Sequence, residues 1–248
     1  GGGAAWLTTT YDPDQNLTFW GTGNPAPWNS DMRPGDNLFS NSVIALDADS
    51  GKRKWYFQHI PNDAWDWDSM NENIPVDVDV DGKKVKAIAN AHKNGFMYLN
   101  DRTTGKFIRA NSFAHVDWGT VTKEGKLDVK ADKRPGVNKD ATFCPSYFGG
   151  KDWAHMSVNP TTNIAFIPTN DICVKLHHEE TQYKKGTMYL GAGGEIEKPG
   201  TGAFTAFDLN TNKIAWQTPT PSPLQSGSAL STAGGLAFVG DLEGYLKA

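Results

Sequence analysis

The sequence predicts an all-β fold, because its composition is typical of many short strands joined by tight turns. The 248 residues include 26 glycines, nine tryptophans, twelve phenylalanines and seven tyrosines, and long apolar runs are few. Glycine supplies backbone conformations that turns require, and aromatic rings fill the space between packed sheets. A chain of this length can form one large β domain or two small ones.

A repeated turn indicates how the strands are arranged. Residues 45–55 and 206–216 share one pattern with the same interval from alanine to tryptophan. In each copy an aspartate begins a polar turn and a glycine or asparagine ends it. The aspartate side chain caps such a turn, and glycine or asparagine accepts a left-handed backbone. Each copy therefore predicts a β-hairpin.

The same turn recurs more loosely along the chain. The five copies begin at Asp12, Asp47, Asp101, Asn159 and Asp208. Their separations of about 35 to 58 residues suit the four-stranded blades of a β-propeller better than a helical solenoid. Five unrelated hairpins in a β-sandwich are the alternative.

Two tryptophans that follow the turn are expected to be structural. A ring at a repeated position near a strand end can wedge between sheets and donate its indole N–H, so we expect Trp55 and Trp216 to lock neighbouring blades. Residues 1–6 begin without a preceding strand, and residues 244–248 stop where another turn is expected. We therefore expect residues 1–248 to form about four to five blades of an open ring, truncated at both ends.

Charge and cysteine content narrow the class of protein. The net charge is −4, and residues 123–134 form only a modestly basic stretch, so we expect no nucleic-acid partner. No apolar stretch approaches the roughly 18 to 20 residues that cross a bilayer. The pair Cys144 and Cys173 favours one disulfide and an oxidising compartment, with two buried free thiols as the alternative.

Four segments carry residues suited to chemistry. They are residues 1–6 (Gly-Gly-Gly-Ala-Ala-Trp), 21–28 (Gly-Thr-Gly-Asn-Pro-Ala-Pro-Trp), 61–68 (Pro-Asn-Asp-Ala-Trp-Asp-Trp-Asp) and 92–98 (His-Lys-Asn-Gly-Phe-Met-Tyr). Together they resemble the methanol and ethanol dehydrogenases that depend on pyrroloquinoline quinone (PQQ), and the turns resemble that family's tryptophan-docking motif. The resemblance spans the whole chain and implies an eight-bladed β-propeller, of which about half to two-thirds is present.

Asp66 and Asp68 are the first candidates for the site. If residues 65–68 are extended, both carboxylates project to one face and Trp65 and Trp67 to the other. Converging carboxylates can bind a hard cation or act in general acid–base catalysis; a solvated acidic loop is the alternative. By resemblance, Asp66 matches the catalytic base and a metal ligand, and Asp68 the extra aspartate of lanthanide-preferring members. The rival interpretation is a calcium enzyme in which Asp68 contacts the metal ligands and not the metal itself.

The resemblance assigns further residues to the cofactor and the metal. Asn24 matches the metal-binding asparagine, although a turn-forming asparagine before proline is common. Trp6 matches the indole that stacks under the quinone, with core packing as the alternative. Lys93 matches the cation that hydrogen-bonds the reacting quinone oxygens, although a lone lysine is usually solvated. Asp152 lies where many relatives have a cofactor-contacting asparagine and the lanthanide-type branch has aspartate.

The resemblance implies a function. It is the oxidation of a small alcohol to an aldehyde by hydride transfer to PQQ, with a lanthanide ion or Ca²⁺. It further implies a periplasmic enzyme that passes electrons to a cytochrome c-type acceptor, a homodimer, and a bond between Cys144 and Cys173. The alternatives are a PQQ dehydrogenase for sugars or polyols and a non-catalytic propeller that binds proteins.

The sequence also departs from the family pattern. Residues 225–228 contain no tryptophan where relatives often have one, and Ala4 replaces a hydroxyl residue that some relatives use to hold PQQ. The family's metal-binding glutamate, vicinal disulfide and anchoring arginine lie in earlier blades that this sequence does not contain. We further expect residues 177–180 to be solvated rather than metal-binding, and residues 109–143 and 176–200 to be loops.

Overall fold

The computed structural model describes residues 2–197, 200–224 and 227–248, and it confirms the predicted all-β class. Its described strands form antiparallel sheets, and the helices in these ranges are two short 3-10 turns, Ser30–Met32 and Ala131–Lys133. Part of the 225–228 segment, where the sequence lacks an expected tryptophan, lies outside the described residues.

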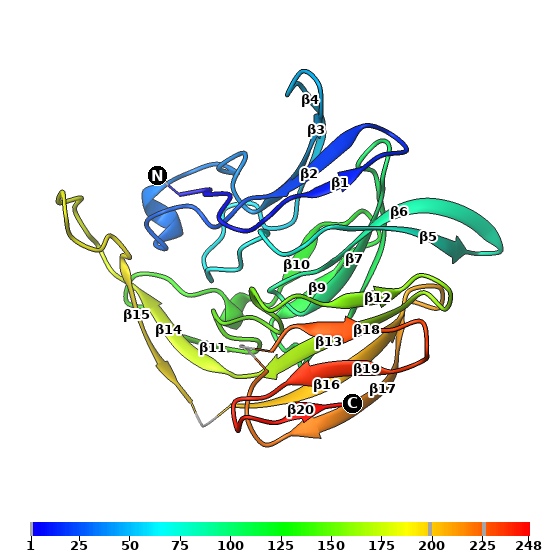
Figure 1. Ribbon diagram of the computed structural model, residues 1–248. Helices are drawn as coiled ribbons and strands as arrows, with labels where there is room; N and C mark the ends of the chain where they lie inside the picture. The colour runs from blue at the N-terminus through cyan, green and yellow to red at the C-terminus, as the bar shows by residue number, and fades with distance from the viewer. Residues whose placement is uncertain (1, 198–199, 225–226) are drawn as a thin grey trace.

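Three four-stranded sheets and one three-stranded sheet follow one another along the chain (Figure 1). The first contains β1 (Thr10–Asp12), β2 (Leu17–Gly21), β3 (Ser42–Asp47) and β4 (Arg53–Gln58). The second contains β5 (Ile74–Val80), β6 (Lys83–Ala91), β7 (Phe96–Asp101) and β8 (Phe107–Ser112). The third contains β12 (Ser157–Asn159), β13 (Ile164–Asp171), β16 (Thr201–Asp208) and β17 (Lys213–Thr220). The fourth contains β18 (Ala229–Ser231), β19 (Ala237–Gly240) and β20 (Leu246–Lys247).

The segments expected to be loops contain strands instead. Two hairpin strands, β9 (Gly119–Val121) and β10 (Leu127–Val129), follow the second sheet. A separate sheet contains β11 (Ala141–Phe143), β14 (Val174–His178) and β15 (Ala192–Ile196). Phe143, Val174 and Leu176 are buried in one cluster with Trp65 and Trp67, so apolar burial accounts for strand formation in these polar stretches.

The predicted turns are confirmed at all five positions. The residue that ends each turn has a left-handed backbone: φ is 53° at Asn16, 65° at Gly51, 73° at Gly105, 56° at Asn163 and 58° at Asn212. The side chain that begins each turn accepts a backbone N–H from within it, as Asp208 does from Asn210 at 2.8 Å. These local bonds close the hairpins as the sequence pattern indicated.

Our interpretation of the turn spacing was wrong in one respect. The turns at Asp12 and Asp47 lie in the same sheet, and so do those at Asn159 and Asp208. A four-stranded antiparallel sheet of this order contains an outer hairpin at each end, and either hairpin can use the motif. The five copies therefore serve three sheets rather than five.

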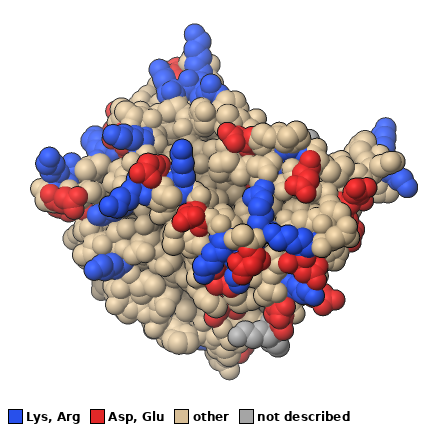
Figure 2. Space-filling model, turned by 180° about the vertical axis from the view of Figure 1, so that it is seen from behind, with Lys and Arg blue, Asp and Glu red and all other residues tan. Residues whose placement is uncertain are grey.

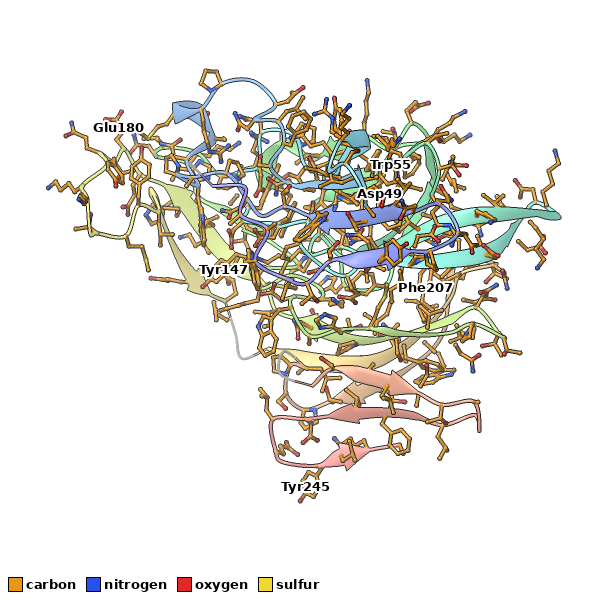
Figure 3. The ribbon with its side chains drawn as sticks, turned by 45° about the horizontal axis from the view of Figure 1, so that its top comes forward. Asp49, Trp55, Tyr147, Glu180, Phe207 and Tyr245 are labelled. Carbon is orange, nitrogen blue, oxygen red and sulfur yellow. A yellow bond between two sulfur atoms is a disulfide. The ribbon has the colours of Figure 1, made fainter. Side chains whose placement is uncertain are left out.

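Apolar clusters join each sheet to the next. Phe19 and Val43 of the first sheet share a cluster with Ile88 of the second. Leu99 of the second shares one with Phe207 of the third, and Phe204 of the third packs with Val239 of the fourth. Phe207 is labelled in Figure 3. This succession of face-to-face sheets is the packing of propeller blades.

The two docking tryptophans differ. Trp55 is buried, and its indole N–H donates to the carbonyl oxygen of Arg102 in the second sheet at 3.2 Å, which confirms the predicted lock. Trp216 is instead 44% exposed and packs against Phe166 and Phe204 of its own sheet. It faces an open cleft of about 570 Å³ between the third and fourth sheets. The expectation is therefore wrong for Trp216.

The surface carries both signs of charge. Basic and acidic side chains intermingle on the face seen in Figure 2. Among the described residues, no helix has the length and apolarity needed to cross a membrane.

Candidate active site

Gly23 brings three of the predicted residues together. Its N–H donates to the carbonyl oxygen of Ala4 at 2.9 Å, and the N–H of Asn24 donates to Asp68 Oδ1 at 2.6 Å. A Cβ on Gly23 would lie 2.7 Å from Asp68 Oδ1 and 3.4 Å from Trp6 Nε1. Trp6, Asn24 and Asp68 therefore surround one position where only glycine fits without displacing a neighbour.

Lys93 joins the two candidate carboxylates. Its ammonium group lies 3.2 Å from Asp66 Oδ2 and 2.9 Å from Asp68 Oδ2. The side chains of Lys93, Asp66 and Asp68 are only 4%, 15% and 7% exposed. Both aspartates lie in the segment that leads into β5, and Lys93 lies in the turn between β6 and β7. Two connections at the same end of the second sheet therefore contribute to the site. Two carboxylates and one ammonium group leave a negative charge when all three are ionised.

Trp65 and Trp67 lie on the other side of this segment, as predicted. Their rings stack with centroids 4.8 Å apart and planes 8° apart. Their indole groups donate to Lys133 O at 2.7 Å and Ser146 O at 3.1 Å. The assumption of an extended strand was wrong, however, because φ of Asp66 is 66°. Aspartate tolerates this left-handed conformation better than most residues.

Asp63 was not among the predicted site residues. This buried carboxylate accepts the N–H groups of Trp65 at 2.9 Å and Trp67 at 3.1 Å. Burial raises the pKa of Asp63, and the hydrogen bond from Trp65 opposes that rise. An aspartate that bonds an amide two residues later is a recognisable turn pattern, so the spacing of Asp63 and Trp65 contained the signal.

A buried ion pair that the sequence did not reveal fixes the segment that carries Asp152 near Lys93. Lys151 lies 2.9 Å from Glu72 Oε2 and donates to the Asp152 carbonyl oxygen at 3.0 Å. Gly150 N–H donates to Lys93 O at 2.8 Å. Asp152 Oδ1 is buried, and no described residue donates a hydrogen bond to it. A buried oxygen without a donor suits a ligand or a cation.

Ser69 and His92, the sequence neighbours of Asp68 and Lys93, belong to one hydrogen-bonded network with neutral histidines. Asn94 N–H donates to His92 Nδ1 at 3.1 Å, so the proton of a neutral His92 is on Nε2. His92 Nε2 lies 2.8 Å from Ser69 Oγ, which in turn lies 3.0 Å from His59 Nδ1. Burial lowers the pKa of His59 to about 3 and lowers that of His92 well below its ordinary value.

The charged residues of the site influence one another strongly. Burial raises the pKa of Asp66 well above its usual range, and the positive charge of Lys93 opposes this rise. Burial would lower the pKa of Lys93, but the charges of Asp66 and Asp68 outweigh it and raise that pKa. Burial also raises the pKa of Asp152. A carboxyl group with a raised pKa beside a fixed cation is a suitable general base.

The donor set fits a hard cation and a flat ring. Asp66, Asp68 and Asp152 offer carboxylate oxygens, and Asn24, whose backbone N–H binds Asp68, carries a side-chain amide oxygen. Oxygen donors with excess negative charge are what Ca²⁺ and related ions prefer. Trp6 is 49% exposed at the edge of this group, so its indole can support a planar ligand.

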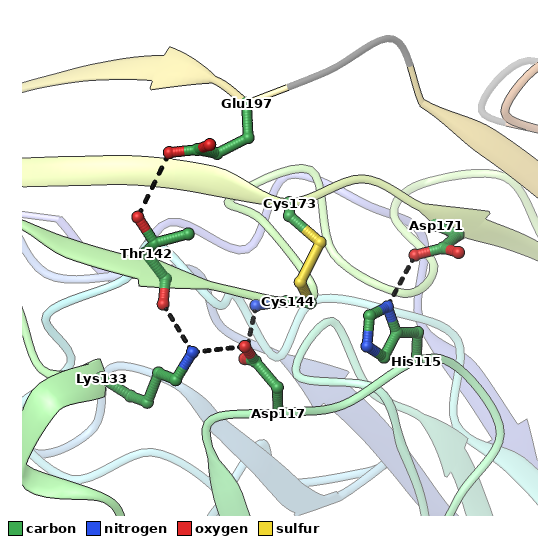
Figure 4. The surroundings of a disulfide bond; sticks show 8 residues. All are labelled: His115, Asp117, Lys133, Thr142, Cys144, Asp171, Cys173 and Glu197. Carbon is green, nitrogen blue, oxygen red and sulfur yellow. Dashed lines mark hydrogen bonds and ion pairs between the residues drawn. A yellow bond between two sulfur atoms is a disulfide. The ribbon is translucent and has the colours of Figure 1, made fainter.

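The predicted disulfide is present between Cys144 and Cys173 (Figure 4). It connects the end of β11 to the chain just before β14. Cys144 N–H donates to Asp117 Oδ1 at 2.7 Å, and Asp117 pairs with Lys133. His115 lies near both sulfur atoms, but their bond to each other leaves no thiolate to bind a metal. The disulfide thus reinforces the sheet that covers Trp65 and Trp67.

Residues 177–180 differ from the expectation in part. His177 is at the surface, 3.2 Å from Glu179. His178 is buried, and its Nε2 lies 3.0 Å from the carbonyl oxygen of Ala64. Alternation along β14 turns these neighbours to opposite sides, so His178 supports the segment that carries Asp66.

Comparison with known proteins gives consistent matches. The family profile "PQQ: Glucose/ethanol/alcohol dehydrogenase, beta-propeller domain" matches residues 1–128. The chain is 42% identical to the quinoprotein alcohol dehydrogenase PedH of Pseudomonas putida, over 100% of this chain and 43% of that protein. It is 38% identical to the lanthanide-dependent methanol dehydrogenase of Methylacidiphilum fumariolicum, over 100% of this chain and 42% of that protein.

Solved structures agree. A europium-containing methanol dehydrogenase superposes with a TM-score of 0.95 at 35% identity, covering 100% of this chain and 44% of that one. The quinohemoprotein alcohol dehydrogenase of Comamonas testosteroni gives a TM-score of 0.89 at 33% identity, covering 97% and 38%. The chain therefore spans less than half the length of these relatives.

Proposed function

Because the chain belongs to the family of PQQ β-propeller dehydrogenases, we propose that it is part of an enzyme that oxidises an alcohol to an aldehyde with PQQ and a metal ion. One observation carries the proposal. Asp66 and Asp68 share Lys93, and Trp6 and Asn24 meet Asp68 around Gly23. Residues from distant parts of the sequence thus form one polar site with an exposed indole at its edge.

The residues have distinct proposed roles. Trp6 supports the PQQ ring, and Asn24, Asp66 and Asp68 hold the metal ion. Lys93 places a permanent positive charge beside the reacting oxygens. Bound PQQ and its metal ion supply a two-electron acceptor and a Lewis acid.

Asp66 is the proposed general base. Its carboxylate would take the hydroxyl proton of the alcohol, and bound PQQ would supply the two-electron acceptor for the hydride that leaves the carbon. Burial raises its pKa, which makes it a stronger base than an exposed aspartate, and the positive charge of Lys93 favours its ionised form. The stacked rings of Trp65 and Trp67 exclude water from the opposite side of the segment and fix its position.

The carboxylates favour a lanthanide over Ca²⁺ as the metal. A trivalent ion needs more negative charge and more oxygen donors than a divalent one. Asp68 adds a second carboxylate beside Asp66, and Asp152 adds an oxygen that no described residue satisfies. Names of relatives include lanthanide-dependent and europium-containing methanol dehydrogenases.

The proposed setting is the periplasm, where the enzyme passes electrons singly to a cytochrome c-type acceptor. The disulfide between Cys144 and Cys173 supports an oxidising compartment. Sugars and polyols are tested as substrates in the same assay as simple alcohols.

The test replaces Asp66 in the full-length holoenzyme. Asp66→Asn keeps a residue that accepts the left-handed backbone but cannot take up the proton. We expect dye-linked alcohol oxidation to fall at least about 100-fold, while the bound PQQ measured by absorbance and the circular dichroism spectrum are retained. The matched control is Asp81→Asn, because Asp81 also has a positive φ (51°) but lies in an exposed turn. Turnover near the wild-type rate in Asp66→Asn would refute the role.

A further inference from the structure

We propose that Asp63 is a positioning residue that gives the segment carrying Asp66 its shape. The inference rests on the proposed function, because it assigns a purpose to the placement of Asp66. The structure gives Asp63 contacts with backbone and amide groups, and it gives Asp66 the contact with Lys93. Asp63 therefore acts on the reaction through Asp66.

The carboxylate of Asp63 lies inside the bend that it holds. Oδ1 accepts the N–H of Trp65, and Oδ2 accepts that of Trp67, at 2.9 and 3.1 Å. The backbone before and after Asp66 is thereby drawn toward one buried side chain. Between these two anchors Asp66 adopts φ of 66°, and its side chain points toward Lys93, away from the stacked rings.

A third donor comes from a separate turn. Asn41 is fully buried, and its Nδ2 donates to Asp63 Oδ2 at 3.2 Å and to Trp67 O at 2.9 Å. The Arg33 guanidinium group donates to the carbonyl oxygen of Asp63. The first sheet's β2–β3 connection thus fixes Asp63 and Trp67 at the same time.

Only a carboxylate satisfies this set of donors. Both oxygens of Asp63 face N–H groups, and an ionised carboxylate is an acceptor at every position. An asparagine would direct its own NH₂ at one or more of these donors, which leaves buried N–H groups unsatisfied and forces the bend to open. The expected consequence is a displaced Asp66 carboxylate with an otherwise intact propeller.

The experiment measures Asp63→Asn in the full-length holoenzyme at saturating alcohol. We expect kcat per PQQ-loaded site to fall at least tenfold, while the PQQ content measured by absorbance and the KM for alcohol stay within about threefold of wild type. The matched control is Asp101→Asn. Asp101 accepts two backbone N–H groups, from Thr103 at 3.0 Å and Thr104 at 2.8 Å, in an exposed turn. The control should leave kcat and Tm near the wild-type values, because both N–H groups bind Oδ1 and asparagine retains that oxygen, as Asn159 does in the equivalent turn.

The outcomes separate this inference from the proposed function. If Asp63→Asn keeps kcat within twofold while Asp66→Asn abolishes turnover, the positioning role is wrong and the base is right. If Asp66→Asn also turns over normally, the proposed function itself fails. Should Asp63→Asn not fold, Asn41→Gly replaces it, because glycine accepts the φ of 49° at that position. Asn41→Gly should lower kcat per loaded site at least fivefold, and an unchanged kcat would overturn the inference.

Discussion

His59 shows how a single buried side chain connects the site to the stability of the protein. Its ring lies 4.5 Å from that of His92 between centroids, with the planes tilted by 37°, and packs against Tyr98. Burial lowers its pKa to about 3 from an ordinary value of 6.5. The folded protein therefore holds His59 neutral, whereas the unfolded chain protonates it at mildly acidic pH.

The pH dependence of stability follows from this difference. Between about pH 6.5 and pH 3 the unfolded chain binds the proton and the folded protein does not, so the free energy of unfolding falls as pH falls. The slope from one such histidine is about 1.4 kcal/mol per pH unit. His59→Asn retains an acceptor for Ser69 but does not titrate in this window. Denaturant unfolding from pH 7 to pH 4.5 should give a shallower slope for this variant; equal slopes would show that His59 does not contribute.

At the scale of elements, local patterns predicted more than distant contacts. The five hairpin turns were predictable because Asp208 and its counterparts bond to backbone groups within the same turn. The strand β14 was not, because Val174 and Leu176 are apolar residues in a polar stretch and their burial depends on Trp65, more than 100 positions away. The strand propensity of a short stretch of sequence does not report such long-range burial.

In the candidate site, too, local sequence patterns predicted some features, and contacts between distant segments determine the others. The predicted separation of the tryptophans from the carboxylates is observed, but it comes from a bend at Asp66 that depends on Asp63 and Asn41 and not from strand alternation. The approach of Lys93 to Asp66 joins two segments with no shared local pattern, so its role came from the resemblance alone. The sequence therefore predicted the residue types of the site but not the groups that hold them.

The disulfide stabilises the element that covers Trp65 and Trp67. It closes a loop with a sequence separation of 29 residues between β11 and β14. Loop-closure entropy for this length corresponds to about 3 to 4 kcal/mol. We expect Cys144→Ala with Cys173→Ala to lose about that much free energy of unfolding. Reductant should lower the Tm of the wild type and leave that of the double variant unchanged; an equal response of both would exclude the disulfide as the cause.

At the scale of the whole molecule, successive sheets are joined by apolar faces and by a few directed polar contacts. Arg102, between the first two sheets, lies 3.1 Å from Asp12 and 3.4 Å from Asp77, and its carbonyl oxygen accepts the indole N–H of Trp55. The equivalent tryptophan of the third sheet, Trp216, borders an open cleft. The same motif thus contributes to assembly only where the next sheet reaches its indole.

This difference predicts which tryptophan hydrogen bond stabilises the propeller. Trp55→Phe keeps an aromatic ring but leaves the carbonyl oxygen of Arg102 without its donor in a buried place, so we expect a loss of about 1 to 3 kcal/mol. Trp20→Phe is the matched control, because the Trp20 indole donates at 3.1 Å to Thr18 of its own strand, in a partly buried place. It should lose less than about 0.5 kcal/mol. Denaturant unfolding of the two variants of the full-length protein measures both values. A loss in Trp20→Phe as large as that in Trp55→Phe would show that the contact between sheets has no special contribution.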